Sequence, residues 1–101
     1  FQSTEEDNVA ALLTEWLRLG MREDETYDAY RARVNKVYTL LTLAQEKPSA
    51  RQYVFMLMDR LQPRFKQAVL ALKAGGKLED AEHINWDEVS GFINAHERNE
   101  M

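Results

Sequence analysis

The chain has 101 residues, with 13 basic and 17 acidic side chains and a formal net charge of −4 at pH 7. This length fits one domain with a modest core, and the acidic balance argues against a module that binds nucleic acid by neutralising phosphates. The chain has no cysteine, which excludes disulfides and thiolate metal sites, and no apolar run approaches the ~20 residues that cross a bilayer.

The N-terminal segment contains three residues that resemble a tag remnant, followed by a predicted helix. Residues 1–3, "FQS", resemble the remnant of a tobacco-etch-virus protease tag, so we leave them out of the fold prediction. Apolar residues then recur at three- and four-residue spacing from Val9 through Trp16 to Leu17. This spacing predicts a helix near residues 5–19, with Gly20 as its stop.

Four further helices are predicted in chain order. One runs near residues 25–46, where Asp24 can cap its start and Lys47-Pro48 closes it. Ser49 with Gln52 forms a capping box that opens a helix near 49–61. The last two are expected near 63–74, from Pro63 in a first turn to Gly75-Gly76, and near 86–98, behind a cap formed by Asn85 and Glu88.

The predicted fold class is therefore all-α, a compact bundle of about five helices, because no alternating strand pattern competes with the helical periodicity. The residues expected in its core are Trp16, Tyr30, Val34, Val37, Leu57, Leu61, Val69, Phe92 and Ile93.

The third predicted helix has more apolar residues than one core-facing stripe needs. Tyr53 to Met58 are six consecutive apolar residues. At about 100° per residue, Val54, Leu57 and Leu61 centre one face, and Phe55 and Met56 fall outside it. Either neighbouring helices cover this helix on several sides, or the surplus docks a second copy of the domain. The candidate self-association surface comprises Gln52, Phe55, Met56 and Asp59, with the helix around Trp16 as a secondary candidate.

No residue pattern predicts catalysis. The two histidines, His83 and His96, lack the HExxH spacing of zinc hydrolases, and no glycine-rich phosphate loop follows a strand. We therefore expect no enzymatic activity, no catalytic residue, no metal site and no cofactor.

The stretch "DETYDAYRARV", residues 24–34, carries a family resemblance. A glutamate is followed by an aromatic residue two positions on, a tyrosine at five, an arginine at eight and an apolar residue at nine. These places hold Glu25, Tyr27, Tyr30, Arg33 and Val34. This pattern resembles the major homology region of Gag capsid proteins of retroviruses and of copia- and gypsy-type LTR retrotransposons. The segment "LMDRLQPRF", residues 57–65, is similar to a helix junction of the same proteins.

One departure affects which branch of the family is implied. Retroviral members have Gln-Gly four and three residues before the glutamate, where this chain has Met21 and Arg22. The resemblance is therefore closer to retrotransposon Gag than to retroviral Gag. It implies that residues 21–101 are a capsid C-terminal domain. Residues 4–20 are then the last helix of an upstream capsid lobe, a connector, or part of this domain.

The resemblance also implies a role for the motif. In the family the glutamate and arginine belong to a buried hydrogen-bond network that ties the loop before the helix to the helix body. We therefore expect Arg33 to bond to Glu25 or to backbone carbonyls near the start of the second helix. The three apolar or aromatic positions are expected to face the core.

The implied function is self-association, in which homodimers build the shell of cytoplasmic virus-like particles and the partner is the protein itself. Neither nucleic acid nor a membrane is expected as a direct partner, since no Cys-His zinc knuckle and no membrane-spanning segment are present. Two alternatives stay open. One is a domesticated capsid lobe that binds a host peptide in an apolar groove, and the other is a SCAN-like dimerisation module.

Overall fold

The computed structural model describes residues 2–100, with the side chains of residues 8–98. The helices are α1 (Gln2–Arg18), α2 (Tyr27–Leu43), α3 (Ala50–Met58), the 3₁₀ turn η1 (Pro63–Phe65), α4 (Lys66–Ala74) and α5 (Trp86–Glu100). No strand occurs in this part of the chain, so the predicted all-α class is confirmed. Of the predicted tag remnant, Phe1 lies outside the described residues.

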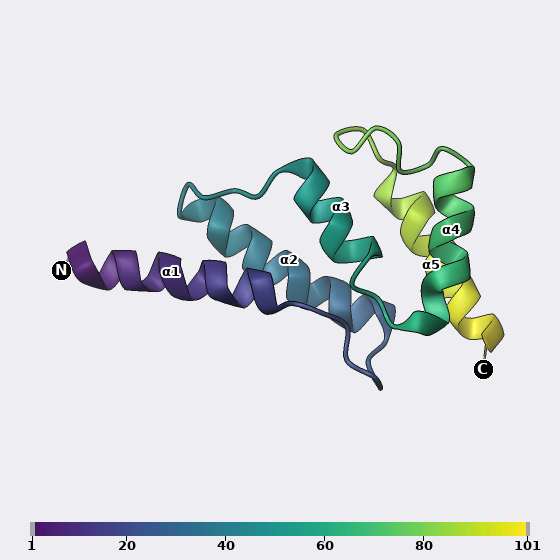
Figure 1. Cartoon of the computed structure of the whole chain (residues 1–101), viewed down its shortest axis with the longest axis horizontal. Coiled ribbons are helices and arrows are strands. Elements are labelled where there is room, and N and C mark those ends of the chain that lie inside the picture. The colour runs from purple at the N-terminus through teal and green to yellow at the C-terminus, as the bar shows by residue number, and fades with distance from the viewer. Residues whose placement is uncertain (1, 101) are drawn as a thin grey trace.

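The helices form two groups that meet along α2 (Figure 1). The long helix α1 lies beside α2 at one end of the molecule, and α4 pairs with α5 at the other. Helix α3 lies against α2, between the two groups. The resulting body is flat, with extents of 50 × 30 × 17 Å, so a large share of each helix is close to the surface.

Local capping determines where the helices begin. The N-cap of α2 is Thr26, whose Oγ1 accepts a hydrogen bond from the Ala29 amide at 3.2 Å. The prediction that Asp24 caps this helix is therefore wrong, and the helix begins two residues after Glu25. At α3 the predicted capping box is confirmed, with Ser49 Oγ and Gln52 Oε1 each accepting the other residue's amide.

Left-handed backbone conformations follow two of the helices. Gly76, after α4, has φ of +72°, a value that glycine adopts without steric cost. Gln45 has φ of 62° after α2, and the helix therefore ends at Leu43 rather than near residue 46. A 3₁₀ turn occupies residues 63–65, where the sequence predicted the first turn of the fourth α-helix.

Most of the predicted core is buried. Trp16, Tyr30, Val34, Val37, Leu57, Val69 and Ile93 are at most 6% exposed. Leu61 is half-buried, and Phe92, with 44% of its surface exposed, contradicts the prediction. The inner face of α5 is formed by Val89, Ser90 and Ile93, and Phe92 lies about 100° around the helix from Ile93.

A row of aromatic rings joins four helices. Trp16 of α1 lies 6.2 Å from Tyr38 of α2, measured between ring centroids. Tyr38 lies 4.8 Å from Tyr53 of α3, which meets Trp86 of α5 edge to face at 5.3 Å. Offset and edge-to-face pairs at these separations add to the stabilisation from burial. The row attaches α1 to the rest of the fold.

Candidate interaction surface

The five motif residues form one structural unit at the start of α2. Arg33 donates from Nε to Glu25 Oε2 at 2.6 Å and from Nη2 to Glu25 Oε1 at 2.7 Å. The same guanidinium donates to the Gly20 carbonyl at 2.8 Å, and the Arg22 amide donates to Glu25 Oε1 at 3.0 Å. The predicted contacts of Arg33 are therefore confirmed, both to the carboxylate and to a backbone carbonyl.

The separation of this ion pair in sequence is explained by where the helix begins. Glu25 precedes α2 and folds back over its first turns, so its carboxylate reaches a residue two turns into the helix. The Glu25 side chain is only 8% exposed and that of Arg33 is 31% exposed. The hydrogen bonds from Arg33 lower the pKa of Glu25, and the same contact raises the pKa of Arg33.

The other three motif residues face the core, as expected. Tyr27, Tyr30 and Val34 are fully buried. The Tyr30 hydroxyl donates to the Met56 carbonyl at 2.6 Å, and burial raises the pKa of Tyr30 to about 12. Met56 lies in the last turn of α3, where helix carbonyls have no partner within the helix. Tyr30 therefore supplies a hydrogen bond that α3 cannot make for itself.

A second segment, distant in sequence, holds the loop between α1 and α2. The Met21 amide donates to the Arg60 carbonyl at 3.0 Å, and Gln62 Nε2 donates to the Met21 carbonyl at 2.7 Å. Arg64 donates to the carbonyls of Glu23 and Glu25, at 3.1 and 2.7 Å. Sequence reasoning missed these contacts, because no local pattern links residues some forty positions apart.

The third helix is more deeply covered than a helix with one buried stripe. Met56, Leu57 and Met58 are consecutive and all buried, and such a run spans about 200° of the helix surface. Met56, at 4% exposed, was predicted to lie on the self-association surface, and that prediction is wrong. Its neighbours on the predicted surface differ, since Gln52, Phe55 and Asp59 are exposed. Phe55 has 48% of its surface exposed.

The secondary candidate, Trp16, also lies in the core. It is 3% exposed and contacts the Tyr38 ring, so it cannot form a surface for a partner. The next residue, Leu17, has 66% of its surface exposed. The helical spacing assigned both residues to the buried face of α1, although neighbours on a helix diverge by about 100°.

Leu17 and Phe55 lie on the same groove, between α1 and α3. The groove has a volume of about 300 Å³, and its lining also includes Arg51 and Arg60. Arg60 connects the two apolar residues, because its guanidinium lies 5.7 Å from the centre of the Phe55 ring and its Nη2 donates to the Leu17 carbonyl at 3.0 Å. We call Leu17, Phe55 and Arg60 the Leu17–Phe55 patch.

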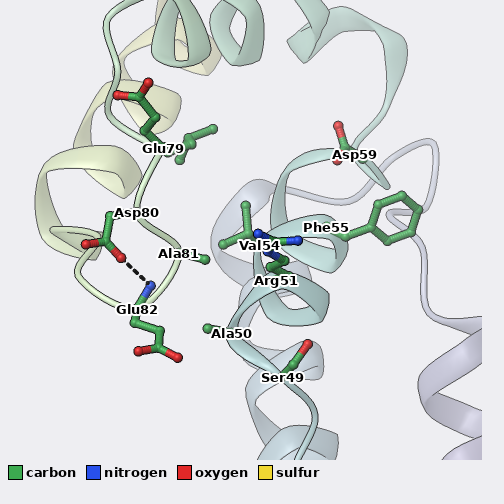
Figure 2. Close-up of a pocket in the computed structure, with 11 residues that line it drawn as sticks. Ser49, Ala50, Arg51, Val54, Phe55, Asp59, Glu79, Asp80, Ala81 and Glu82 are labelled. Atoms are coloured by element: carbon green, nitrogen blue, oxygen red, sulfur yellow. Dashed lines mark hydrogen bonds between the residues drawn. The ribbon is translucent and has the colours of Figure 1, made fainter.

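A larger groove lies on the other side of α3 (Figure 2). It has a volume of about 820 Å³ and separates α3 from the segment 78–82. Val54, Phe55 and Leu78 contribute apolar surface to it. Glu79, Asp80 and Glu82 of the facing segment line this groove together with Arg51 of α3, and Phe55 points away from that segment.

The titratable residues form no cluster suited to a metal. Among the residues that the structure describes, no group of three or more histidine, aspartate or glutamate side chains could hold an ion. His83 contacts Asp80, with Nδ1 2.9 Å from Oδ2, and His96 Nε2 lies 3.0 Å from the Arg64 carbonyl oxygen. Within the same residues, no helix combines the length and apolar character needed to span a membrane.

Comparison with known proteins gives no relative: no family model, no curated protein and no solved structure matches the chain.

Proposed function

We propose that this chain is a self-association module of a Gag-like capsid protein, in which copies pair through α3 and assemble into a shell in the cytoplasm. The observation that carries the proposal is the Leu17–Phe55 patch. Met56, Leu57 and Met58 of α3 are buried, yet Phe55 is 48% exposed beside Leu17, which is 66% exposed. Exposed apolar surface of this kind is typical of sites where another protein binds.

The motif supports the family part of the proposal. All five positions of the major-homology-like pattern take the roles that the resemblance implies. Glu25 and Arg33 bond to each other, and Tyr27, Tyr30 and Val34 are fully buried. The pair also bonds to the loop before α2, through the Gly20 carbonyl and the Arg22 amide.

A two-fold contact suits the size of the patch. In a two-fold dimer the same residues of both copies meet, so each exposed side chain occurs twice in the contact. Complete burial of a leucine or phenylalanine side chain contributes about 1.5–3 kcal/mol, and half-exposed side chains contribute less. Pairing through Leu17 and Phe55 should therefore be weak in isolation, and many weak contacts are strengthened when a shell links them.

The groove beside the segment 78–82 favours a second candidate function. Its volume of about 820 Å³ is within the range of binding clefts, and it has apolar surface from Val54 and Leu78. A domesticated capsid lobe could bind a host peptide there as an adaptor. A SCAN-like dimerisation module is intermediate between the two, because it pairs without building a shell.

Sedimentation velocity over a concentration series tests the proposal. We expect the wild-type chain to show reversible, concentration-dependent dimerisation, and Leu17→Ala with Phe55→Ala to weaken it without loss of helical content. The matched control is Leu70→Ala with Phe92→Ala, which truncates a leucine and a phenylalanine of similar exposure, 53% and 44%, on α4 and α5. A wild-type chain that stays monomeric at every concentration would refute self-association and favour the peptide-binding adaptor.

A further inference from the structure

A third groove lies between the C-terminal end of α3 and α4, and we call it the α4 groove. It has a volume of about 440 Å³, which is within the range of ligand-binding clefts. Buried side chains line it, namely Met58, Phe65 and Val69, and the Leu70 side chain beside them is 53% exposed. The groove shares no lining residue with the groove of about 300 Å³ beside Leu17. It is therefore a separate apolar site, built largely by the helix junction at residues 57–65.

The charged side chains of the α4 groove are mostly basic, although the whole chain is acidic. They are Lys66, Lys73 and Asp59. Lys73 donates to Asp59 at 2.9 Å, and the two side chains are 47% and 37% exposed. Lys66 is exposed and forms no hydrogen bond or ion pair with the described residues. The groove therefore has an excess of positive charge, and the unpaired charge is that of Lys66.

The lysines stand at both ends of an apolar pair on one face of α4. Val69 and Leu70 follow Lys66 by three and four residues, which is the spacing of one helix face. Lys73 follows Lys66 by seven residues on the same face, and seven residues rise about 10 Å along a helix. A second helix that lies along α4 matches this face when two apolar residues stand between two carboxylates at the same spacing.

We infer that the α4 groove binds an amphipathic helix of another protein, in which acidic side chains flank an apolar pair. The apolar pair packs on Leu70 and the buried residues beside it, and the carboxylates face Lys66 and Lys73. An amphipathic helix in an apolar groove is a common mode of peptide recognition. The occupant is not a second copy, because no stretch of these 101 residues has acidic residues three positions before and three positions after an apolar pair.

Charge and apolar contact have different roles in this site. Exposed ion pairs contribute little to affinity individually, but like charges that face each other are excluded. The apolar pair therefore supplies most of the affinity, and the lysines select an acidic helix over a basic one. This inference goes beyond the proposed function, since a monomeric chain could bind such a helix equally well.

Fluorescence anisotropy with three labelled synthetic peptides tests the inference. The first is a blocked helix of alanine and glutamine, with a pair of adjacent leucines and with glutamates three positions before and three positions after the pair. The second has lysines in place of the glutamates, and the third has alanines in place of the leucines. We expect the wild-type chain to bind the glutamate peptide saturably, and roughly tenfold more tightly than either of the others.

Substitutions at exposed positions then locate the site. Lys66→Glu should bind the glutamate peptide roughly tenfold more weakly, because a repulsion replaces an attraction, and it should bind the lysine peptide more tightly than the wild type does. Leu70→Ala should weaken binding of the glutamate peptide several-fold. The matched control is Lys36→Glu, which makes the same change of charge at an exposed position on α2 outside the α4 groove.

Each outcome decides the inference. Absence of saturable binding of the glutamate peptide, or equal affinity for the lysine peptide, would overturn it. Equal binding by Lys66→Glu and Lys36→Glu would do the same, as would loss of binding in Leu17→Ala with Phe55→Ala, which alters another surface. Self-association is measured separately by sedimentation, and Lys66→Glu should dimerise like the wild type. The α4 groove can therefore fail while the proposed function stands, and the reverse.

Discussion

Glu25 and Arg33 are eight residues apart and share two hydrogen bonds, at 2.6 and 2.7 Å, across the first turns of α2. Both residues also bond to the loop before the helix. Glu25 also accepts the Arg22 amide, and Arg33 also donates to the Gly20 carbonyl. The pair thus fixes the conformation of the loop between α1 and α2. The position of α1 relative to α2 depends on that loop.

Loss of the guanidinium should destabilise the fold. In Arg33→Ala the Glu25 carboxylate, 8% exposed, loses both hydrogen bonds from the guanidinium and keeps only the Arg22 amide, and the Gly20 carbonyl loses its bond from Arg33. Leaving such acceptors unpaired costs on the order of 1–3 kcal/mol, and we expect that decrease in the free energy of unfolding. Urea denaturation followed by circular dichroism measures it. Lys36→Ala, on the same helix and exposed, is the control, and equal stability of the two variants would make Arg33 an ordinary surface charge.

Acid should remove the contribution of the Glu25–Arg33 pair to the free energy of unfolding. Hydrogen bonds from Arg33 lower the pKa of Glu25 below its ordinary value of 4.5, so the folded state favours the ionised carboxylate. The stabilisation is fully present above the unfolded-state pKa and is lost as the pH falls through the folded-state pKa. The free energy of unfolding of the wild type should therefore fall more steeply below pH 4.5 than that of Glu25→Gln.

The control for this titration is Glu46→Gln, which removes an exposed carboxylate from the loop after α2. It should keep the wild-type dependence on pH. Parallel curves for the wild type and Glu25→Gln through the acid range would show that the ion pair makes no pH-dependent contribution.

Local signals predicted the helices well, because each depends on residues close in sequence. The Ser49–Gln52 capping box and the Asn85 cap of α5 are present as expected. The N-cap of α2 is Thr26 and not Asp24 as predicted. Glu25, between these two residues, folds back onto Arg33. The family pattern predicted that contact, whereas helical spacing alone assigns residues eight apart no contact.

Burial was predicted less well where several elements meet. Periodicity gives the direction of a buried stripe but not the number of neighbours that cover a helix. Met56 is buried because α3 is covered around most of its circumference, and Phe92 is exposed because α5 buries a narrower face. The contacts of Gln62 and Arg64 with residues 21–25 join segments about forty residues apart, for which the sequence offers no local sign.

Substitutions at the neighbouring residues Trp16 and Leu17 should affect different properties, the first the stability of the fold and the second its self-association. Trp16 is 3% exposed and joins α1 to the aromatic row, so Trp16→Ala leaves a large cavity and should cost about 3–5 kcal/mol of unfolding free energy. Leu17 is 66% exposed, and Leu17→Ala should change stability by no more than about 0.5 kcal/mol. Its effect should appear instead in sedimentation, as weaker dimerisation. If Leu17→Ala destabilises the monomer as much as Trp16→Ala does, Leu17 belongs to the core and the Leu17–Phe55 patch is not a surface for a second copy.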